Sequence, residues 1–376
     1  MNASHPTTTA TEPVRLTSHA EVVAAAHSPE VYSSATSRFL HVPNTMDGAE
    51  HAKFRALVDS YMTSEIVAEL EPSFREIAED LVRDLPVGTE FDAVTDFGAK
   101  FAVRAQCAWL GWPVELEDRL IAWMDSNVAA QRSGEPERNA AVAQEFDEIV
   151  RERVAAVSAE IAGGAESAQS SAAHESVTAK LSREVVDGRT LTNDEIVSIL
   201  RNWTAGDLSS LAQCVGVVVA QVLSNEDLHK RVTYLSTREA NERANLELDR
   251  IIDECIRIND PFITSKRITA CPVTGAGGTE IAQGTRVILD WAAANRDPEV
   301  FGDPDAFDPD TNAPHNLVYG TGPHVCPGRE LSTMELRVVT RALFGSQHEF
   351  SRVGPEWLTA EQPPLGGWAH VKVLFR

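Results

Sequence analysis

The sequence lacks paired cysteines, long apolar runs and an excess of positive charge. Its five cysteines show no CxxC spacing, and their number is odd, so neither a disulfide framework nor a zinc site is favoured. No run of about 18 uninterrupted apolar residues occurs, so we expect no membrane-spanning helix. The formal net charge of -23 argues against nucleic acid or an anionic membrane as a partner. These absences favour a soluble, cytoplasmic protein, and we expect it to be a monomer.

Length and composition allow one large domain. The chain has 376 residues, of which 43% are hydrophobic, and a single helical domain of this size is compatible with both values. Residues 1–13 are rich in Thr and Ala and have no apolar segment, so they are predicted to form a disordered tail rather than a signal peptide. We therefore predict one domain over residues 14–376.

Helical patterns dominate the first half of that domain. After a strand and helix pattern at 14–22, the pattern is mostly helical to about residue 163. The small, polar segment 163–173 is predicted to be a flexible loop. Prolines are expected to break the helices, namely Pro29, Pro43, Pro72, Pro86 and Pro113.

The second half combines long helices with a β-rich segment. Thr192 and Glu195 form a capping box, which predicts a long helix to about Leu223. Further helices are predicted over about 245–258 and 328–344. Strands are predicted over 262–290, with the glycine cluster at 275–278 as a turn. The sequence therefore predicts a mainly α fold with a minor β-sheet region.

The most informative segment is Tyr319-Gly320-Thr321-Gly322-Pro323-His324-Val325-Cys326-Pro327-Gly328-Arg329. A single cysteine stands in a glycine-rich loop, directly before a helical pattern. Glycine lets a backbone approach a flat ligand closely, and cysteine thiolate is one of the axial ligands of haem iron. The alternative interpretation is a buried structural cysteine beside a turn.

This segment resembles the haem-binding signature of the cytochrome P-450 superfamily, with Tyr319 in place of the usual Phe. The stretch Asn295-Arg296-Asp297-Pro298 resembles a second marker of the family, in the same order along the chain. The resemblance covers roughly residue 15 to the end, with a shortened N-terminal region. It implies the cytochrome P-450 fold, a haem b cofactor (iron protoporphyrin IX) and Cys326 as the iron ligand.

The resemblance also assigns residues around the haem. His51 and Arg55 match a His-x-x-x-Arg pattern that binds a haem propionate, and Arg is suited to pairing with carboxylates. Arg267 and His324 complete the expected propionate set, and Gly320 and Gly322 belong to the ligand loop.

A Glu-x-x-Arg pair is expected to support the ligand loop from behind. Glu254 and Arg257 match the family's buried pair and are interpreted as structural. The family usually adds an Arg after a Phe-Asp-Pro segment, but Thr311 stands at that position. His315 or Asn316 could substitute for it.

The long helix departs from the family pattern at the place where an acid and an alcohol relay protons. Leu208 replaces the acid, and Ser209 keeps the hydroxyl. Asp207 is offset by about 100° around the helix, so Ser209 with ordered water, or the substrate's own hydroxyl, is expected to deliver protons. Helical spacing places on the haem face Asn202, Ala205, Gly206 and Ser209. The alternative is a tolerated change that leaves ordinary monooxygenation intact.

Pro327 is a second departure. It removes the N–H after Cys326, which would leave the sulfur with fewer donors and lower the iron potential. It also suits the first position of the following helix.

The resemblance implies an enzyme that activates O2 with electrons from a separate ferredoxin and ferredoxin reductase. Arg329, Arg337 and Lys53 are candidates for docking an acidic ferredoxin. The short segment between Ser34 and His51 suggests an open pocket for a large substrate, such as a peptide or a carrier-bound molecule. The expected substrate is a small molecule or a peptide. Candidate pocket residues are Asn202, Trp203, Thr204, Phe262, Ile263 and Thr264.

The expected reaction belongs to secondary metabolism and is either hydroxylation or oxidative cross-linking of aromatic or peptide side chains. The alternatives are a haem sensor without turnover and a peroxide-driven peroxygenase.

Overall fold

The computed structural model describes residues 12–162, 176–275, 278 and 280–376. All but the last two residues of the predicted tail over 1–13, and all of the predicted loop over 163–173, lie outside the described residues. The assignment of residues 14–376 to one domain stays a prediction.

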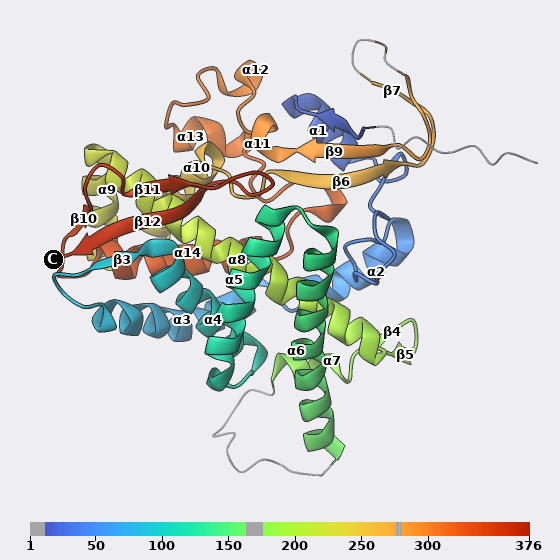
Figure 1. Ribbon diagram of the computed structural model, residues 1–376, viewed down its shortest axis with the longest axis horizontal. Coiled ribbons are helices and arrows are strands. Elements are labelled where there is room, and N and C mark those ends of the chain that lie inside the picture. Colours follow the sequence, from blue (N-terminus) through green and yellow to red (C-terminus); the bar gives the residue numbers. More distant parts are fainter. Residues whose placement is uncertain (1–11, 163–175, 276–277, 279) are drawn as a thin grey trace, which may run out of the picture.

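Helices form most of the molecule, and α8 (Asn193–Ser224) runs through its middle (Figure 1). The predicted capping box is present, because Thr192 accepts from the Glu195 N–H and the Glu195 carboxylate accepts from the Thr192 N–H. The other long helices are α2 (Gly48–Asp59), α3 (Ser64–Asp84), α4 (Ala99–Leu110), α5 (Glu117–Ser133), α6 (Pro136–Ala162), α9 (Glu226–Thr237), α10 (Glu242–Ile258) and α14 (Arg329–Phe344).

Short helices complete the framework. They are α1 (His19–Ala26), α7 (Val177–Leu181), α11 (Trp291–Ala294), α12 (Pro298–Phe301) and α13 (Pro309–Asn312), and a π-helical turn, Ala93–Gly98, precedes α4. The helices predicted over 192–223 and 328–344 are confirmed within one residue, whereas α10 begins three residues before the predicted 245.

Two small sheets flank α8. In the first, β1 (Val14–Leu16) pairs in parallel with β9 (Arg286–Asp290), and β6 (Thr264–Thr269) joins β9 to β2 (Tyr32–Ser33). The second contains β3 (Glu90–Asp92), β10 (Phe350–Arg352), β11 (Leu358–Ala360) and β12 (Trp368–Phe375). Figure 1 shows the sheets at opposite ends of the molecule.

Two hairpins complete the β structure. They are β4 (Val185–Val186) with β5 (Arg189–Thr190), and β7 (Val273–Thr274) with β8 (Glu280–Ile281). The Gly278 N–H donates to the Gly275 carbonyl across the second hairpin. The predicted strands at 262–290 are therefore confirmed, whereas residues 276 and 277 of the predicted turn lie outside the described residues.

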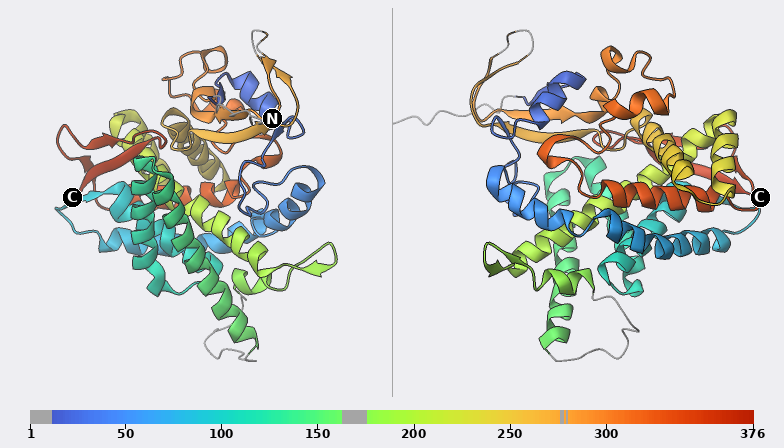
Figure 2. Two further views of the ribbon diagram at one scale, coloured as in Figure 1. Left: turned by 45° about the vertical axis from the view of Figure 1, so that its right-hand side comes forward. Right: turned by 180° about the vertical axis from the view of Figure 1, so that it is seen from behind.

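Pro72 does not break a helix, contrary to the prediction, because it lies inside α3. A proline removes the bond to the carbonyl four residues earlier, here that of Ala68. Both residues are exposed, so water can hydrate the freed carbonyl, while the opposite face of α3 packs on α14 (Figure 2, right).

The core surrounds α8 on all sides. Among the described residues α8 is the one helix whose length and hydropathy suit a membrane span, and 72% of its most apolar window is buried in the protein, as in the core helix of a soluble protein.

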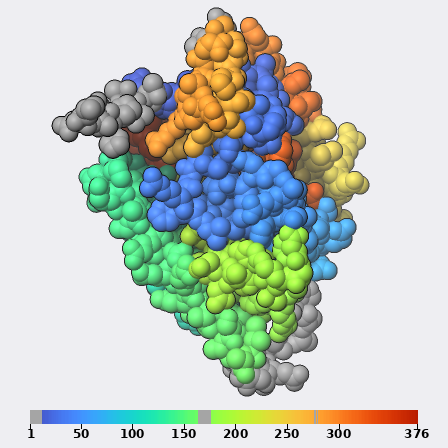
Figure 3. All heavy atoms as spheres, turned by 90° about the vertical axis from the view of Figure 1, so that its right-hand side faces the viewer, coloured from blue at the N-terminus to red at the C-terminus, as the bar shows by residue number. Residues whose placement is uncertain are grey.

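The segment between β2 and α2 is short and has no regular structure. None of its residues, all of which are described, lies in a helix or strand. It is anchored to α8, because the Val42 N–H donates to Ser198 Oγ and the Asn202 amide donates to the Val42 carbonyl. In Figure 3 this segment and α2, in blue, separate the β4–β5 hairpin from the first sheet.

Candidate functional site

Cys326 borders two adjoining cavities between α8 and the loop that precedes α14. The larger measures about 390 Å³ and the smaller about 200 Å³. Both are lined by Gly206, Asp207, Ser332 and Cys326. The larger extends to β6 and Tyr319, and the smaller extends to Trp109 and Trp203. The cysteine singled out in the sequence therefore faces the middle of the long helix.

Backbone hydrogen bonds fix the Cys326 loop. The Cys326 N–H donates to the Tyr319 carbonyl at 2.9 Å. Burial raises the pKa of the Cys326 thiol, while the Gly328 N–H, and more weakly Arg55 and Arg329, act in the opposite direction. The sulfur thus keeps one backbone donor although Pro327 supplies none. Pro327 is not the first residue of a helix, because α14 begins at Arg329, so the predicted capping role was wrong.

Gly322 is required by the close approach of the loop to α1. It adopts a φ of 75°, and a Cβ at this position would lie 2.4 Å from the Ala26 carbonyl oxygen. Gly320 also has a positive φ, of 68°, and lines the larger cavity. A residue with a side chain would be strained at either position.

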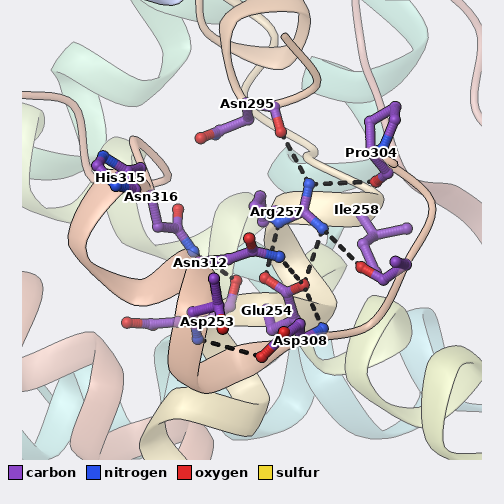
Figure 4. A network of polar contacts seen from close by, with 12 residues as sticks. Asp253, Glu254, Arg257, Ile258, Asn295, Pro304, Asp308, Asn312, His315 and Asn316 are labelled. Atoms are coloured by element: carbon purple, nitrogen blue, oxygen red, sulfur yellow. Dashed lines mark hydrogen bonds and ion pairs between the residues drawn. The ribbon is translucent and has the colours of Figure 1, made fainter. Parts of the chain in front are cut away.

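Glu254 and Arg257 form a buried ion pair whose other hydrogen-bond partners lie in the segment 295–312. Arg257 Nε donates to Glu254 Oε2 at 2.7 Å, and Nη2 donates to Oε1 at 2.8 Å. The remaining guanidinium N–H groups bind the carbonyls of Asn295, Pro304 and Ala306 (Figure 4). Both side chains are at most 1% exposed. Since a buried ion pair is tolerated only when its hydrogen-bonding groups are satisfied, the pair locks three loop carbonyls together.

The third partner of this pair is Asn312, and the proposal of His315 or Asn316 was wrong. Asn312 Nδ2 donates to Glu254 Oε1 at 2.8 Å. Asn316 donates instead to the Asp253 carbonyl, and the exposed His315 stacks edge-on against His19. Figure 4 shows His315 away from the carboxylate.

Asn295 links this network to the ligand loop. Its Oδ1 accepts from the Leu317 N–H at 2.7 Å, and its Nδ2 donates to the buried Asp260 carboxylate at 3.3 Å. Asp260 also accepts from the Phe262 N–H at 2.7 Å. The Asn-Arg-Asp-Pro stretch therefore ties the loop to the start of β6.

A cluster of basic side chains occupies one edge of the larger cavity. Arg267 and His324 line it, and the His51 ring lies 4.1 Å from the His324 ring. Burial, together with His51 and Arg267, lowers the pKa of His324 to about 4. Burial also lowers the pKa of Arg267. Arg267 is 9% exposed, and it forms no ion pair with a carboxylate in the described part of the chain. The cluster would be stabilised by an anion.

Arg55 is placed differently from this cluster. Its Nη1 donates to the carbonyls of Pro323 and Val325, and its Nε pairs with Asp59. It does not line either Cys326 cavity. In this structure Arg55 holds the backbone of the ligand loop, and its binding of a propionate stays a prediction.

The rotation of α8 differs from the predicted one. Gly206, Asp207, Ser210 and Leu211 face the larger Cys326 cavity, whereas Ser209 lines a separate cavity with residues of α5 and β12. Ser209 Oγ is buried without a hydrogen-bond partner among the described residues. The placement of Ser209 and Ala205 on the Cys326 face was therefore wrong, and the placement of Gly206 was right. Asp207 is the residue that the sequence reasoning dismissed.

Asp207 forms a buried acidic pair with Glu335 of α14. Burial raises the pKa of Asp207 to about 7. Burial and the nearby Asp207 carboxylate raise the pKa of Glu335 well above its usual value. Asp207 Oδ2 and Glu335 Oε2 have no hydrogen-bond partner among the described residues. Because two buried carboxylates resist being charged together, the pair holds at least one proton near neutral pH.

The predicted pocket residues separate into two groups. Phe262 and Thr264 line the larger Cys326 cavity, and Asn202 and Trp203 line the smaller one. Thr204 is fully buried and accepts from the Gln106 amide of α4, so it faces away. Ile263 lines neither cavity and approaches the turn at Gly366.

The candidate docking cations are all engaged with carboxylates. Lys53 pairs with Asp187 at 2.6 Å, and Arg337 pairs with Asp249 at 2.7 Å. Arg337 is largely buried, so the prediction that it is a docking group at the surface was wrong. Arg329 remains 57% exposed, with Asp253 at 3.8 Å.

The residues around these cavities fit a haem group. A flat, mostly apolar ligand requires open space beneath α8, and a Cβ on Gly206 would meet no atom within 4 Å. An iron ligand requires a sulfur facing that space, which Cys326 supplies. Two propionates require basic side chains at the edge of that space. Arg267 meets that need, because it forms no ion pair with a carboxylate among the described residues, and His324 lies beside it, 3.5 Å from Asp47.

Comparisons with known proteins agree with this arrangement. The family model described as cytochrome P-450 matches residues 222–346. The chain is 26% identical over 372 residues to cyclomarin C epoxidase CymV of Salinispora arenicola, covering 95% of this chain and 89% of that protein. It is 28% identical over 311 residues to vitamin D(3) 25-hydroxylase of Pseudonocardia autotrophica, covering 81% and 70%.

Solved structures share the fold. A post-tailoring hydroxylase (HmtN) involved in himastatin biosynthesis superposes with a TM-score of 0.79 at 23% identity, over 96% of this chain and 90% of that one. A mutant of P-450 EryK in complex with erythromycin B gives a TM-score of 0.81 at 22% identity, over 96% and 90%.

Fold, motifs and relatives together define an oxidoreductase of the haem-dependent monooxygenase class. Residues 222–346 match the cytochrome P-450 family model, and the chain has the cytochrome P-450 fold.

Proposed function

We propose that the protein binds haem b through Cys326 and inserts oxygen into an organic substrate during secondary-metabolite tailoring. The observation that carries this proposal is the sulfur of Cys326 facing Gly206 and Asp207 across a cavity edged by Arg267, which forms no ion pair with a carboxylate among the described residues. Bound haem would supply reductive activation of O2. Cys326 would hold its iron, and a thiolate ligand favours O–O cleavage.

The chain's own groups would orient the cofactor and handle protons. Arg267 and His324, with His51 next to His324, would bind the haem propionates at the edge of the larger cavity. The Glu254–Arg257–Asn312 network would hold the ligand loop at a fixed distance from α8. Asp207 would carry the proton on Oδ2, with Glu335 as the group from which it is replenished, since burial keeps at least one of the two carboxyl groups protonated near neutral pH. This replaces the route through Ser209.

Relatives favour oxygen insertion over cross-linking. One relative is named an epoxidase and another a hydroxylase, and a structural neighbour is named a post-tailoring hydroxylase. We therefore propose hydroxylation or epoxidation of a small molecule or peptide. Electrons would come from a separate ferredoxin and its reductase, and the enzyme would act as a soluble monomer in the cytoplasm.

The first test is the carbon-monoxide difference spectrum of the reduced protein and two cysteine variants. Thiolate ligation shifts the Soret band strongly to the red, and Cys326→Ala is expected to abolish that band. Cys214→Ala is the matched control, because Cys214 lines the same cavity but burial raises the pKa of its thiol far above the usual value. A red-shifted band that survives Cys326→Ala, or depends on Cys214, would refute the assigned ligand.

A second experiment tests the electron source. Product formation with ferredoxin, its reductase and NADPH supports a monooxygenase. Product that forms only with added peroxide would instead identify a peroxygenase.

A further inference from the structure

Three redox-active aromatic side chains lie in ring contact beside the Cys326 cavity. Trp109 of α4 and Trp203 of α8 have ring centroids 5.2 Å apart, and Tyr61, just after α2, lies 5.5 Å from Trp203. Their exposed fractions are 5%, 7% and 6%, respectively. The rings therefore form a continuous buried array that is shielded from water.

The inner end of this array is at the functional site. Trp203 and Trp109 both line the smaller Cys326 cavity. An oxidant formed in that cavity would meet these indole rings directly. Trp109 Nε1 is buried without a hydrogen-bond partner among the described residues, so an oxidised Trp109 has no acceptor for its proton. It would return to the neutral form by taking an electron from a neighbouring ring.

The outer end of the array opens on a different cavity. Tyr61 and Trp109 line a groove of about 700 Å³ between α3, α4 and α7, and Cys326 is not part of its wall. The Tyr61 hydroxyl donates to Glu184 Oε1 at 2.7 Å, and Glu184 lines the same groove. A tyrosine that loses an electron must also lose its proton, and the Glu184 carboxylate is placed to take it.

We propose that Trp203, Trp109 and Tyr61 form an electron-transfer chain between the Cys326 cavity and the surface groove. The chain supplies electrons to an oxidant that has formed in the cavity and has not reacted with substrate. Trp203 gives one electron to the oxidant and becomes a radical cation. Tyr61 then reduces Trp203 by one electron while its phenolic proton moves to Glu184, which leaves a neutral tyrosyl radical. A soluble one-electron reductant, such as a thiol or ascorbate, returns an electron to Tyr61 at the groove, and the proton returns from Glu184.

Tyr319 provides an internal comparison. It also lines a Cys326 cavity, but its hydroxyl is 3.1 Å from Thr333 Oγ1 and has no carboxylate partner among the described residues. A hydroxyl is a poor proton acceptor, so oxidation of Tyr319 is less favourable. The placement of a carboxylate next to Tyr61 is therefore what directs the charge outward.

The Trp203–Trp109–Tyr61 array is suited to removing an oxidant and not to delivering electrons from a ferredoxin. Oxidising Trp or Tyr requires a strong oxidant, which exists only after O2 or peroxide has reacted. Electrons therefore do not move through these rings in the resting enzyme. They move only when an oxidant persists in the cavity without substrate.

The test reacts the substrate-free, haem-loaded enzyme with peroxide and freezes it for electron paramagnetic resonance. The wild type is expected to give a tyrosyl radical, and Tyr61→Phe is expected to lose most of that signal and to inactivate faster. Tyr234→Phe is the control, since Tyr234 is 49% exposed on α9, outside the array, and should retain the signal.

A second variant separates proton transfer from packing. Glu184→Gln keeps an oxygen that can accept the Tyr61 hydrogen bond but is a much weaker proton acceptor. It should reduce the tyrosyl signal and speed inactivation while the rings stay in place. Added ascorbate should quench the wild-type radical and slow its inactivation, with little effect on Tyr61→Phe.

The inference goes beyond the proposed function but relies on haem bound at Cys326. No tyrosyl signal in the wild type, or an unchanged signal in Tyr61→Phe, would overturn it while the red-shifted carbon-monoxide band remains. Loss of that band in the wild type would instead overturn the proposed function together with this inference.

Discussion

Asn312 Nδ2 donates to Glu254 Oε1, the same carboxylate oxygen that accepts from Arg257 Nη2. Oε1 also accepts from the Asp308 N–H at 3.0 Å. A neutral amide thus completes the shell of the buried carboxylate where the family usually places a second arginine. Because Asp308 is also the N-cap of α13, the carboxylate anchors the start of that helix as well as its last residue.

Replacing Asn312 should weaken the whole protein rather than the chemistry alone. Asn312→Ala leaves a buried, charged oxygen with one donor fewer, which typically costs about 1–3 kcal/mol. We expect a lower unfolding free energy in urea and a faster loss of haem. His315→Ala is the control, since its exposed side chain does not touch Glu254, and a loss equal to that of Asn312→Ala would contradict the assignment.

Asn312 could not be found from the sequence for a geometric reason. The family pattern directs attention to position 311, but a four-residue helix capped by Asp308 turns position 312 towards Glu254. Glu254 and Arg257 themselves were predictable, because i and i+3 share a helix face. Short irregular segments between helices carry no periodicity from which to derive such a rotation.

The rotation of α8 escaped prediction for a different reason. Its ends were predictable from the capping box, but it is buried on nearly all sides. A helix without a polar face gives no signal for which side meets a cavity. Spacing alone therefore grouped Ser209 with Gly206, while packing places Asp207 and Ser210 there.

Asp207→Asn should disrupt proton delivery, and Ser209→Ala should not. The amide keeps the size of the carboxylate but cannot pass on a proton, and general acid–base groups typically contribute at least about 10²-fold. With a substrate found by its shift of the haem spectrum, Asp207→Asn should lower product formed per NADPH consumed and release more peroxide. Uncoupling by Ser209→Ala but not by Asp207→Asn would restore the route predicted from the sequence.

Arg267→Met should have opposite effects on the haem-free and haem-loaded protein. Without haem, it removes a buried guanidinium that has no carboxylate partner among the described residues, so the unfolding free energy should rise by on the order of 1 kcal/mol. With haem, it removes a charged hydrogen bond worth about 1.5–3 kcal/mol. Transfer of haem to excess apomyoglobin should therefore be faster than in the wild type, and an unchanged rate would show that no propionate binds there.

The contribution of Asp260 to the stability of the protein should fall as the pH rises from about 4 to about 7. Burial raises the pKa of Asp260 to about 7, whereas an unfolded Asp titrates near about 3.9. Between these values the folded state keeps a proton that the unfolded state has lost, so raising the pH favours unfolding.

Asp260→Asn removes this titration. It should remove a negative contribution of about one proton, or about 1.4 kcal/mol per pH unit, from the slope of the unfolding free energy against pH. The introduced amide faces the donating Asn295 Nδ2, which adds a constant penalty, so the slope and not the absolute stability is the measurement. Urea unfolding between about pH 4.5 and about pH 6.5 would measure this slope, because both values lie between the two pKa values of about 3.9 and about 7. Asp227→Asn, at a side chain that is 98% exposed, is the control, and equal slopes in wild type and Asp260→Asn would show that Asp260 is already ionised in the folded protein.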